Sequence, residues 1–407
     1  MKKIIEKIIP VFLICFILTI NCYSQWPQWR GPNRDGISTE TGLLKNWPVD
    51  GPKLLWSVDS VGDGFSSTSV NEKIAYIIGK RDSVEIVTAI NLNGQVLWQT
   101  AFGRAKKDNS WPQSRCTPTI YENKIYAVTV YGDVACLNAK TGEINWSIPL
   151  FESIGSIGYN LPDKGVSESP LIIDDKVILT PCGLQTTAIA LNRFSGEKIW
   201  QTESLRDSTW FTSPLLIRTG KATAVFCSSN HNEVLVDPDS GKLIWKGERT
   251  SGMVPVADKN QIYFTGEFKK GGSLCQWNED LNERSVVWTD TISANAMGGA
   301  VKFKNKLYVS GNSKGIFCLD SETGKVLSYF EAVNYCNLMV ADNMLYSYED
   351  RGGKISLFDI SGDEIKLVSS FKINQGKGPR IAHLSIADGL MLVRRGKVLM
   401  AFDVRQN

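Results

Sequence analysis

A six-residue pattern, a glycine turn followed within four residues by tryptophan, recurs through this chain and limits what it can fold into. The clear copies are Asn93–Trp98, Thr141–Trp146, Ser195–Trp200 and Ser240–Trp245. Glu283–Trp288 lacks the glycine, and Thr323–Ser328 has serine in place of tryptophan. Glycine allows the positive φ that a tight hairpin needs, and tryptophan offers a large flat face for packing on a neighbouring unit. The pattern therefore predicts repeated hairpins that stack on one another.

Eight strands end in Asn or Asp, and in most copies a glycine turn follows. They end at Asn91, Asn138, Asn192, Asp237, Asn278, Asp320, Asp359 and Asp403. Two further short strands precede each of them, so every unit reads as a four-stranded antiparallel sheet. Even spacing of such units with periodic Gly and aromatic residues is typical of a β-propeller.

The last unit lacks its outer strand, since only four residues follow Val398–Asp403. Lys53–Val58 resembles an outer strand but has no unit before it. We therefore predict an all-β, eight-bladed β-propeller over residues 53–407, with the ring closed by this N-terminal strand. The Trp residues expected to pack between blades are Trp56, Trp98, Trp146, Trp200, Trp245 and Trp288.

The first 24 residues are typical of an export signal, with three Lys before an apolar run that is too short to span a bilayer. We expect cleavage after Ser24, an N-terminal extension over residues 25–52, and a periplasmic or extracellular protein. A lipid anchor at Cys22 is the alternative.

Composition excludes several classes of function. The formal net charge is only +3, which leaves no electrostatic footprint for nucleic acid. The sequence has only two His and no CxxC pair, which excludes a His-rich metal site and a zinc site of the CxxC type, so no metal is predicted. Cys136 and Cys318 fall at one repeat position whose equivalents are Ala190 and Leu235, which indicates buried apolar thiols and not a disulfide framework.

The [Ser/Thr]-Gly-[Glu/Lys]-x-x-Trp repeat resembles the tryptophan-docking motif of pyrroloquinoline-quinone-type propellers, over almost the whole chain after residue 52. This resemblance implies one of two branches. One holds quinoprotein alcohol and sugar dehydrogenases, and the other holds non-enzymatic repeat proteins, including the lipoprotein that assists outer-membrane β-barrel assembly. Trp26–Gly36 looks like the Trp-Arg-Gly-Pro opening of many exported members.

Candidate binding residues lie at the channel mouth where the innermost strands begin. They are Arg115, Glu168, Trp210, Asn337, Arg380 and His383. An Arg and a carboxylate in a concave mouth suit an anionic or sugar-like ligand. The alternative is that they form salt bridges or rim charges of purely structural use.

The N-terminal segment carries a second set of candidates, Trp29, Arg30, Arg34 and Asp35. These side chains either fold over a channel mouth and bind a ligand, or pin the N-terminus beside the closing strand.

We predict a monomeric binding scaffold of the cell envelope, with no catalytic residue and no cofactor, whose partner is an envelope protein or a small polar ligand. The alternative is a dehydrogenase using pyrroloquinoline quinone and calcium, with Glu168 as a metal ligand. The resemblance implies an adjacent Cys-Cys pair for such enzymes, and this sequence has none. A carbohydrate-binding propeller is a second alternative, with Trp111–Arg115 and Trp210–Phe211 as stacking loops.

Overall fold

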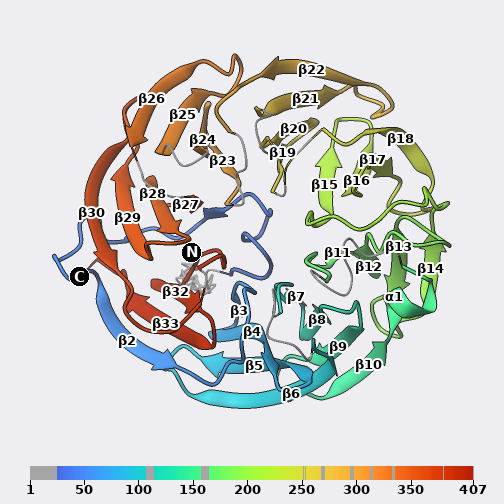
Figure 1. The fold of residues 1–407 in the computed structure, drawn as a ribbon, viewed down its shortest axis with the longest axis horizontal. Coiled ribbons are helices and arrows are strands. Elements are labelled where there is room, and N and C mark those ends of the chain that lie inside the picture. The colour runs from blue at the N-terminus through green and yellow to red at the C-terminus, as the bar shows by residue number, and fades with distance from the viewer. Residues whose placement is uncertain are drawn as a thin grey trace, which may run out of the picture.

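Eight antiparallel sheets surround a central axis in the computed structural model (Figure 1). The structure describes residues 25–106, 114–156, 165–250, 252, 254–266, 271–293, 298–311, 315–331, 335–378 and 380–406. The predicted signal peptide with Cys22, and Trp111 of one predicted stacking loop, lie outside these residues. The prediction of an eight-bladed propeller of four-stranded blades is confirmed.

The first four blades follow the chain from inner to outer strand. Blade 1 is β3 (Ser69–Asn71), β4 (Ile74–Arg81), β5 (Val84–Asn91) and β6 (Val96–Arg104). Blade 2 is β7 (Thr119–Tyr121), β8 (Lys124–Val128), β9 (Val134–Asn138) and β10 (Ile144–Ile148), followed by the short helix α1 (Leu150–Ser153). Blade 3 is β11 (Leu171–Ile173), β12 (Lys176–Leu179), β13 (Ile189–Asn192) and β14 (Lys198–Gln201). Blade 4 is β15 (Leu215–Arg218), β16 (Thr223–Ser228), β17 (Asn232–Val236) and β18 (Leu243–Glu248).

The last four blades include both strands that come from the N-terminal part of the chain. Blade 5 is β19 (Val256–Asp258), β20 (Gln261–Phe264), β21 (Ser273–Trp277) and β22 (Arg284–Thr289). Blade 6 is β23 (Ala300–Phe303), β24 (Lys306–Gly311), β25 (Gly315–Asp320) and β26 (Val326–Glu331). Blade 7 is β27 (Cys336–Ala341), β28 (Met344–Glu349), β29 (Lys354–Asp359) and β30 (Lys366–Lys372), with β1 (Ile37–Ser38) parallel to β27. Blade 8 is β31 (Ser385–Ala387), β32 (Leu390–Arg395), β33 (Val398–Asp403) and β2 (Lys53–Val58).

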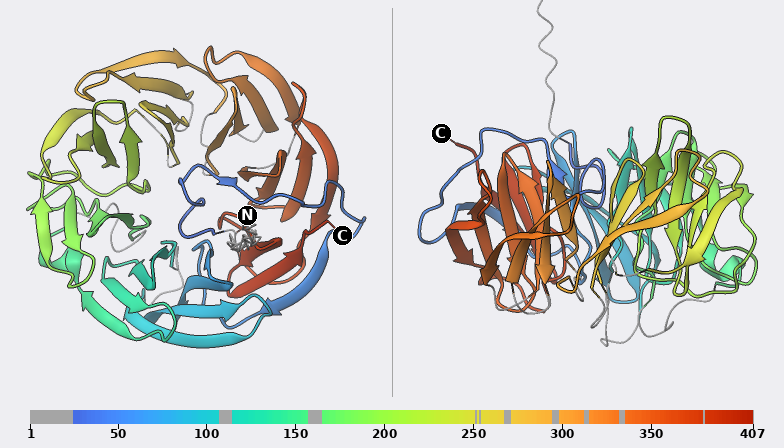
Figure 2. Two further views of the ribbon diagram at one scale, coloured as in Figure 1. Left: turned by 180° about the vertical axis from the view of Figure 1, so that it is seen from behind. Right: turned by 90° about the horizontal axis from the view of Figure 1, so that it is seen from above.

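The ring closes as predicted, because β2 pairs antiparallel with β33 and supplies the missing outer strand. The two ends of the chain therefore share one sheet, and the blades form a closed disc (Figure 2). Hydrophobic cores lie between neighbouring blades. The seven cysteines after residue 24 are buried and free, as predicted for Cys136 and Cys318 from their repeat position.

The Asn or Asp at each predicted strand end accepts hydrogen bonds from the backbone of the turn that follows. The Asn192 Oδ1, for example, accepts from Phe194 N at 2.8 Å and Ser195 N at 3.1 Å. This side-chain acceptor fixes the turn, which explains why the eight units share the residue type.

Most repeat Trp residues lie against the turn of the next blade. Trp200 on β14 donates from Nε1 to the Pro238 carbonyl at 2.9 Å, and a Cβ at Gly241 (φ +73°) would lie 2.7 Å from its ring. Glycine is thus needed both for the turn and for the ring that covers it. Trp56, Trp98, Trp146 and Trp288 make the same Nε1 bond to a carbonyl of the next turn, at 2.8–3.2 Å.

Trp245 differs because the turn of blade 5 has no glycine. Its ring instead packs edge-on against Trp277 at 5.4 Å between centroids, beneath the Arg284 guanidinium at 4.5 Å. Leu281 fills this turn with a fully buried side chain.

Blade 7 has Ser369 at the Trp position, and a residue from outside the repeats fills the place. Trp47 donates its backbone N–H to the Ser369 Oγ at 2.9 Å, and its ring packs on Phe371 and Tyr346 at centroid distances of 5.6 and 5.8 Å. The N-terminal extension thereby joins the core between blades 7 and 8.

We predict that Trp200→Ala lowers the free energy of unfolding by about 3–5 kcal/mol, because it removes a buried ring and its hydrogen bond. The neighbouring change Ile199→Ala, at a side chain 39% exposed on the same strand, should cost less than about 1 kcal/mol. Denaturant unfolding followed by tryptophan fluorescence measures both. Equal losses in the two variants would contradict the role of the Trp contact.

Candidate functional site

A ring of hydroxyl groups links neighbouring blades where the inner strands begin. The backbone N–H of one blade donates to the hydroxyl of the next, and the series runs from blade 8 to blade 4. Its bonds are His383 N to Ser67 Oγ at 2.9 Å, Ser67 N to Thr117 Oγ1 at 3.2 Å, Thr117 N to Ser169 Oγ at 3.0 Å and Ser169 N to Ser213 Oγ at 2.9 Å. Small polar residues at this position therefore hold adjacent blades together.

The N-terminal segment, residues 25–38, crosses the channel and bonds to the inner strands (Figure 1). Arg30 and Arg34 carry its two buried side-chain charges, with exposures of 1% and 2%. Arg34 donates from Nη1 to the carbonyls of Ser169 and Pro214 at 3.1 and 2.9 Å, and from Nη2 to that of Pro170. Its Nε donates to Gln28 Oε1 at 2.8 Å.

Arg30 bonds to blade 6, where the hydroxyl ring is interrupted. The ring positions of blades 5 and 6 are Val254 and Gly299, which carry no hydroxyl. Arg30 Nη1 donates to the Gly298 carbonyl at 3.3 Å and Nη2 to the Ala300 carbonyl at 2.5 Å. Burial lowers the pKa of Arg30 to about 10 and that of Arg34 to about 9, so both guanidinium groups stay charged at neutral pH.

Trp29, Asp35 and His383 lie around these arginines. Trp29 meets the His383 ring edge-on at 5.8 Å between centroids. Burial and the nearby Arg30 hold the pKa of His383 well below its usual range, so the imidazole is neutral. Asp35 Oδ1 accepts from Ile37 N at 2.9 Å, and burial raises the pKa of this carboxyl.

Glu168 is buried, and both of its carboxylate oxygens accept from Thr180 N at 2.9 Å. Burial raises its pKa to about 8, although the Thr180 bonds and the charge of Arg34 act in the opposite direction. Glu168 is therefore largely protonated at neutral pH.

The other predicted residues do not gather into one group. Arg115 donates to Ser167 Oγ at 3.0 Å, and Trp210 lies under the Arg249 guanidinium at 4.0 Å. Asn337 donates from Nδ2 to the carbonyls of Ile381 and Ala382, and Arg380 donates to the Arg351 carbonyl. Each of these side chains has a partner from the fold itself.

The residues present do not fit the calcium-bound quinone that the dehydrogenase branch would imply. Calcium takes six to eight oxygen ligands, whereas the Glu168 oxygens are bonded to Thr180 N and face the positive charge of Arg34. Within the described ranges, no three His, Cys, Asp or Glu side chains come together to hold a metal.

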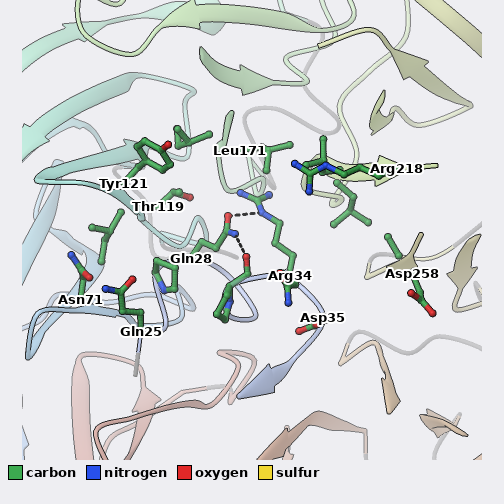
Figure 3. A pocket seen from close by; sticks show the side chains of 18 of the residues that line it. Gln25, Gln28, Arg34, Asp35, Asn71, Thr119, Tyr121, Leu171, Arg218 and Asp258 are labelled. Atoms are coloured by element: carbon green, nitrogen blue, oxygen red, sulfur yellow. Dashed lines mark hydrogen bonds between the residues drawn. The ribbon is translucent and has the colours of Figure 1, made fainter. Parts of the chain in front are cut away.

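A cavity of about 780 Å³ opens where the inner strands end, and not where they begin, which is where the first set of candidates was predicted (Figure 3). Of the predicted residues, Arg34 and Asp35 line it. Tyr121, Arg218, Asp258 and Lys259 also line it and were missed, because the repeat was aligned only at the strand starts. The same alignment, followed four or five residues along each strand, reaches these positions.

A family match covers residues 81–328, more than half of the chain, and is described as "Outer membrane protein assembly factor BamB". The chain belongs to this family.

Two curated relatives represent the two branches. The chain is 22% identical over 246 residues to the outer membrane protein assembly factor BamB of Shewanella oneidensis, covering 58% of this chain and 56% of the relative. It is 24% identical over 203 residues to a quinoprotein ethanol dehydrogenase of Pseudomonas aeruginosa, covering 46% of this chain and 30% of the relative. The chain thus spans about half of the first relative and less than a third of the second.

Solved structures share the fold. BamB from Moraxella catarrhalis superposes with a TM-score of 0.60 at 14% identity, over 87% of this chain and 98% of that one. A quinohemoprotein alcohol dehydrogenase from Comamonas testosteroni gives a TM-score of 0.69 at 12% identity, over 94% and 81%. At these identities the likeness concerns the propeller alone.

We predict that Arg34→Met lowers the free energy of unfolding by about 3–5 kcal/mol, because it leaves buried carbonyls without a donor. It should also release the N-terminal segment, so the amides that bond to it, Val70 and Ile120, should exchange hydrogen faster. Arg206→Met, at an exposed arginine, is the matched control and should change neither quantity. Unchanged exchange in Arg34→Met would show that the segment is held by other contacts.

We predict that Glu168 makes the protein less stable as the pH rises. Between about pH 4.5 and 8, the folded carboxyl keeps a proton that the unfolded chain has lost, so the free energy of unfolding falls by up to about 1.4 kcal/mol per pH unit. Glu168→Gln has no such titration, so its unfolding midpoint should decline less between pH 5 and pH 8. Glu143→Gln, at an exposed carboxylate, should decline as the unmodified chain does. Parallel pH profiles for all three proteins would refute a protonated Glu168.

Proposed function

We propose that the chain is an exported, non-enzymatic propeller that binds protein partners in the cell envelope and serves in outer-membrane protein assembly. The observation that carries this proposal is the occupation of the channel by the chain's own residues 25–38. Arg30 and Arg34 bond to carbonyls of residues that come just before the inner strands, so side chains of the protein itself occupy this part of the channel. Membership of the assembly-factor family supports the same function.

The proposal includes export from the cytoplasm and function without a cofactor. The described residues contain no helix long and apolar enough to cross a membrane. Export rests on the sequence of residues 1–24, and cofactor-free function rests on the poor fit of Glu168 to calcium.

The carbohydrate alternative gains no support from Trp210. Its ring is covered by the Arg249 guanidinium and contacts Phe211 at 5.1 Å between centroids, so it does not present an open face to a sugar.

We predict that the protein forms discrete crosslinks to envelope proteins in living cells. A photo-reactive amino acid can be placed at Leu184 or Phe194 in two loops of blade 3, or at Val286 on blade 5, three apolar side chains that are 53–63% exposed. At least one position should give a defined protein adduct, and deletion of the gene should lower the amount of outer-membrane β-barrel protein. A probe at Leu137, which is fully buried, is the matched control and should give none.

The absence of adducts at all three positions from a folded, exported protein would contradict the scaffold function. Saturable binding of pyrroloquinoline quinone with calcium to residues 25–407, seen as a rise in melting temperature, would favour the dehydrogenase instead.

A further inference from the structure

The mouth at the ends of the inner strands already binds one extended peptide, which is the chain's own N-terminal segment. Trp26 and Val70 exchange two backbone hydrogen bonds at 3.0 and 2.7 Å, and Ile120 N donates to the Pro27 carbonyl at 2.8 Å. On the other side, Val340 N donates to the Gly36 carbonyl at 2.9 Å, and β1 pairs with β27. The inner edges of β3, β7 and β27 are therefore covered by main chain.

The inner edges of blades 3, 4 and 5 are not covered in this way. β11, β15 and β19 are the first strands of their sheets, and no other described strand pairs with their channel edges. Residues of all three strands line the cavity of about 780 Å³, a volume within the range of about 300–1,000 Å³ that is usual for ligand pockets. An exposed strand edge can accept a further extended peptide through backbone hydrogen bonds.

Six charged residues line the cavity: Arg34, Arg218 and Lys259 are cationic, and Asp35, Glu122 and Asp258 are acidic. Arg218 extends from β15 toward the middle of the cavity, on the side of Arg34 (Figure 3). Its backbone N–H donates to the Lys259 carbonyl at 3.3 Å, so the two cationic residues are neighbours across blades 4 and 5. Both side chains are exposed, and neither has a carboxylate partner in the part of the chain that the structure describes.

The acidic residues of the lining interact with cations that do not line the cavity. Asp35 interacts electrostatically with the buried Arg30, whose Nη2 also donates to the Asp35 carbonyl at 3.0 Å. Glu122 forms two bonds with Arg193, at 2.9 and 3.0 Å, and Asp258 pairs with Lys302 at 2.5 Å. The charges of Arg218 and Lys259 consequently remain for a ligand, with the buried Arg34 behind them.

We propose that this cavity binds an extended acidic segment of a partner protein, with its backbone along the inner edges of β11, β15 and β19 and a carboxylate between Arg218 and Lys259. The inference rests on the proposed scaffold function and names the chemistry of one partner site. Tyr121 also lines the cavity, with one face of its ring under the Arg193 guanidinium at 4.8 Å.

The test uses residues 25–407 and a displayed library of random ten-residue peptides. Selection on the unmodified protein should enrich Asp and Glu, and selection on R218E/K259E should not. A selected peptide, measured by fluorescence anisotropy, should bind the double variant at least about tenfold more weakly, and its Asn/Gln counterpart should lose a similar factor. Affinity should also fall when NaCl rises from 50 to 300 mM, since exposed charges are screened.

The double variant K140E/R206E is the matched control, because it reverses two exposed cations away from the cavity and should bind as the unmodified protein does. Absence of acidic enrichment, or equal binding to R218E/K259E, would overturn the proposal. Binding of an acidic oligosaccharide that displaces no peptide and depends on Arg218 would also overturn it, in favour of a sugar site. Envelope crosslinks that persist in R218E/K259E, together with failed peptide selection, would leave the scaffold function intact and refute only this site.

Discussion

Every blade of this propeller depends on a contact with its neighbour, because a four-stranded sheet cannot bury both faces by itself. The Trp ring of one outer strand covers the turn of the next blade, and a hydrophobic core fills the space beneath it. The hydroxyl ring near the axis makes a second row of contacts between the same blades. Neighbouring blades are thus held together by aromatic packing at the rim and by hydrogen bonds near the axis.

The fold could be predicted from the sequence because each blade repeats the same local physics. The Asn or Asp that accepts from its turn, the glycine and the Trp are neighbours in sequence, so their pattern is visible without a structure. Trp47 was missed because it lies outside the repeat and contacts Ser369 across more than three hundred residues. Trp47 takes the place of the missing repeat Trp in blade 7, where Ser369 stands at that position.

The candidate site was harder to predict, since side chains at equivalent repeat positions have different functions in different blades. Glu168 and Arg115 are conspicuous in sequence, yet both are bound by groups of the fold. Arg30 and Arg34 could bind a ligand or hold the fold together, depending on where residues 25–38 lie in the structure. The residues next to them in the sequence do not reveal that position. In the structure the Arg30 guanidinium bonds to carbonyls of blade 6, and the Arg34 guanidinium bonds to carbonyls of blades 3 and 4. The cavity lies beside them and not at the strand starts.

The pairing of β2 with β33 joins residues that are about as far apart in the chain as any two strands can be. Such a contact closes the longest loop in the propeller, and its two strands can pair only after all the blades between them have been synthesised. Until β33 has been made, β2 has no partner, and Trp47 cannot yet be buried between blades 7 and 8. A nascent chain must therefore persist as an open row of blades with one exposed strand edge at each end. During synthesis these unpaired edges are the places where the chain is most prone to pair with other chains.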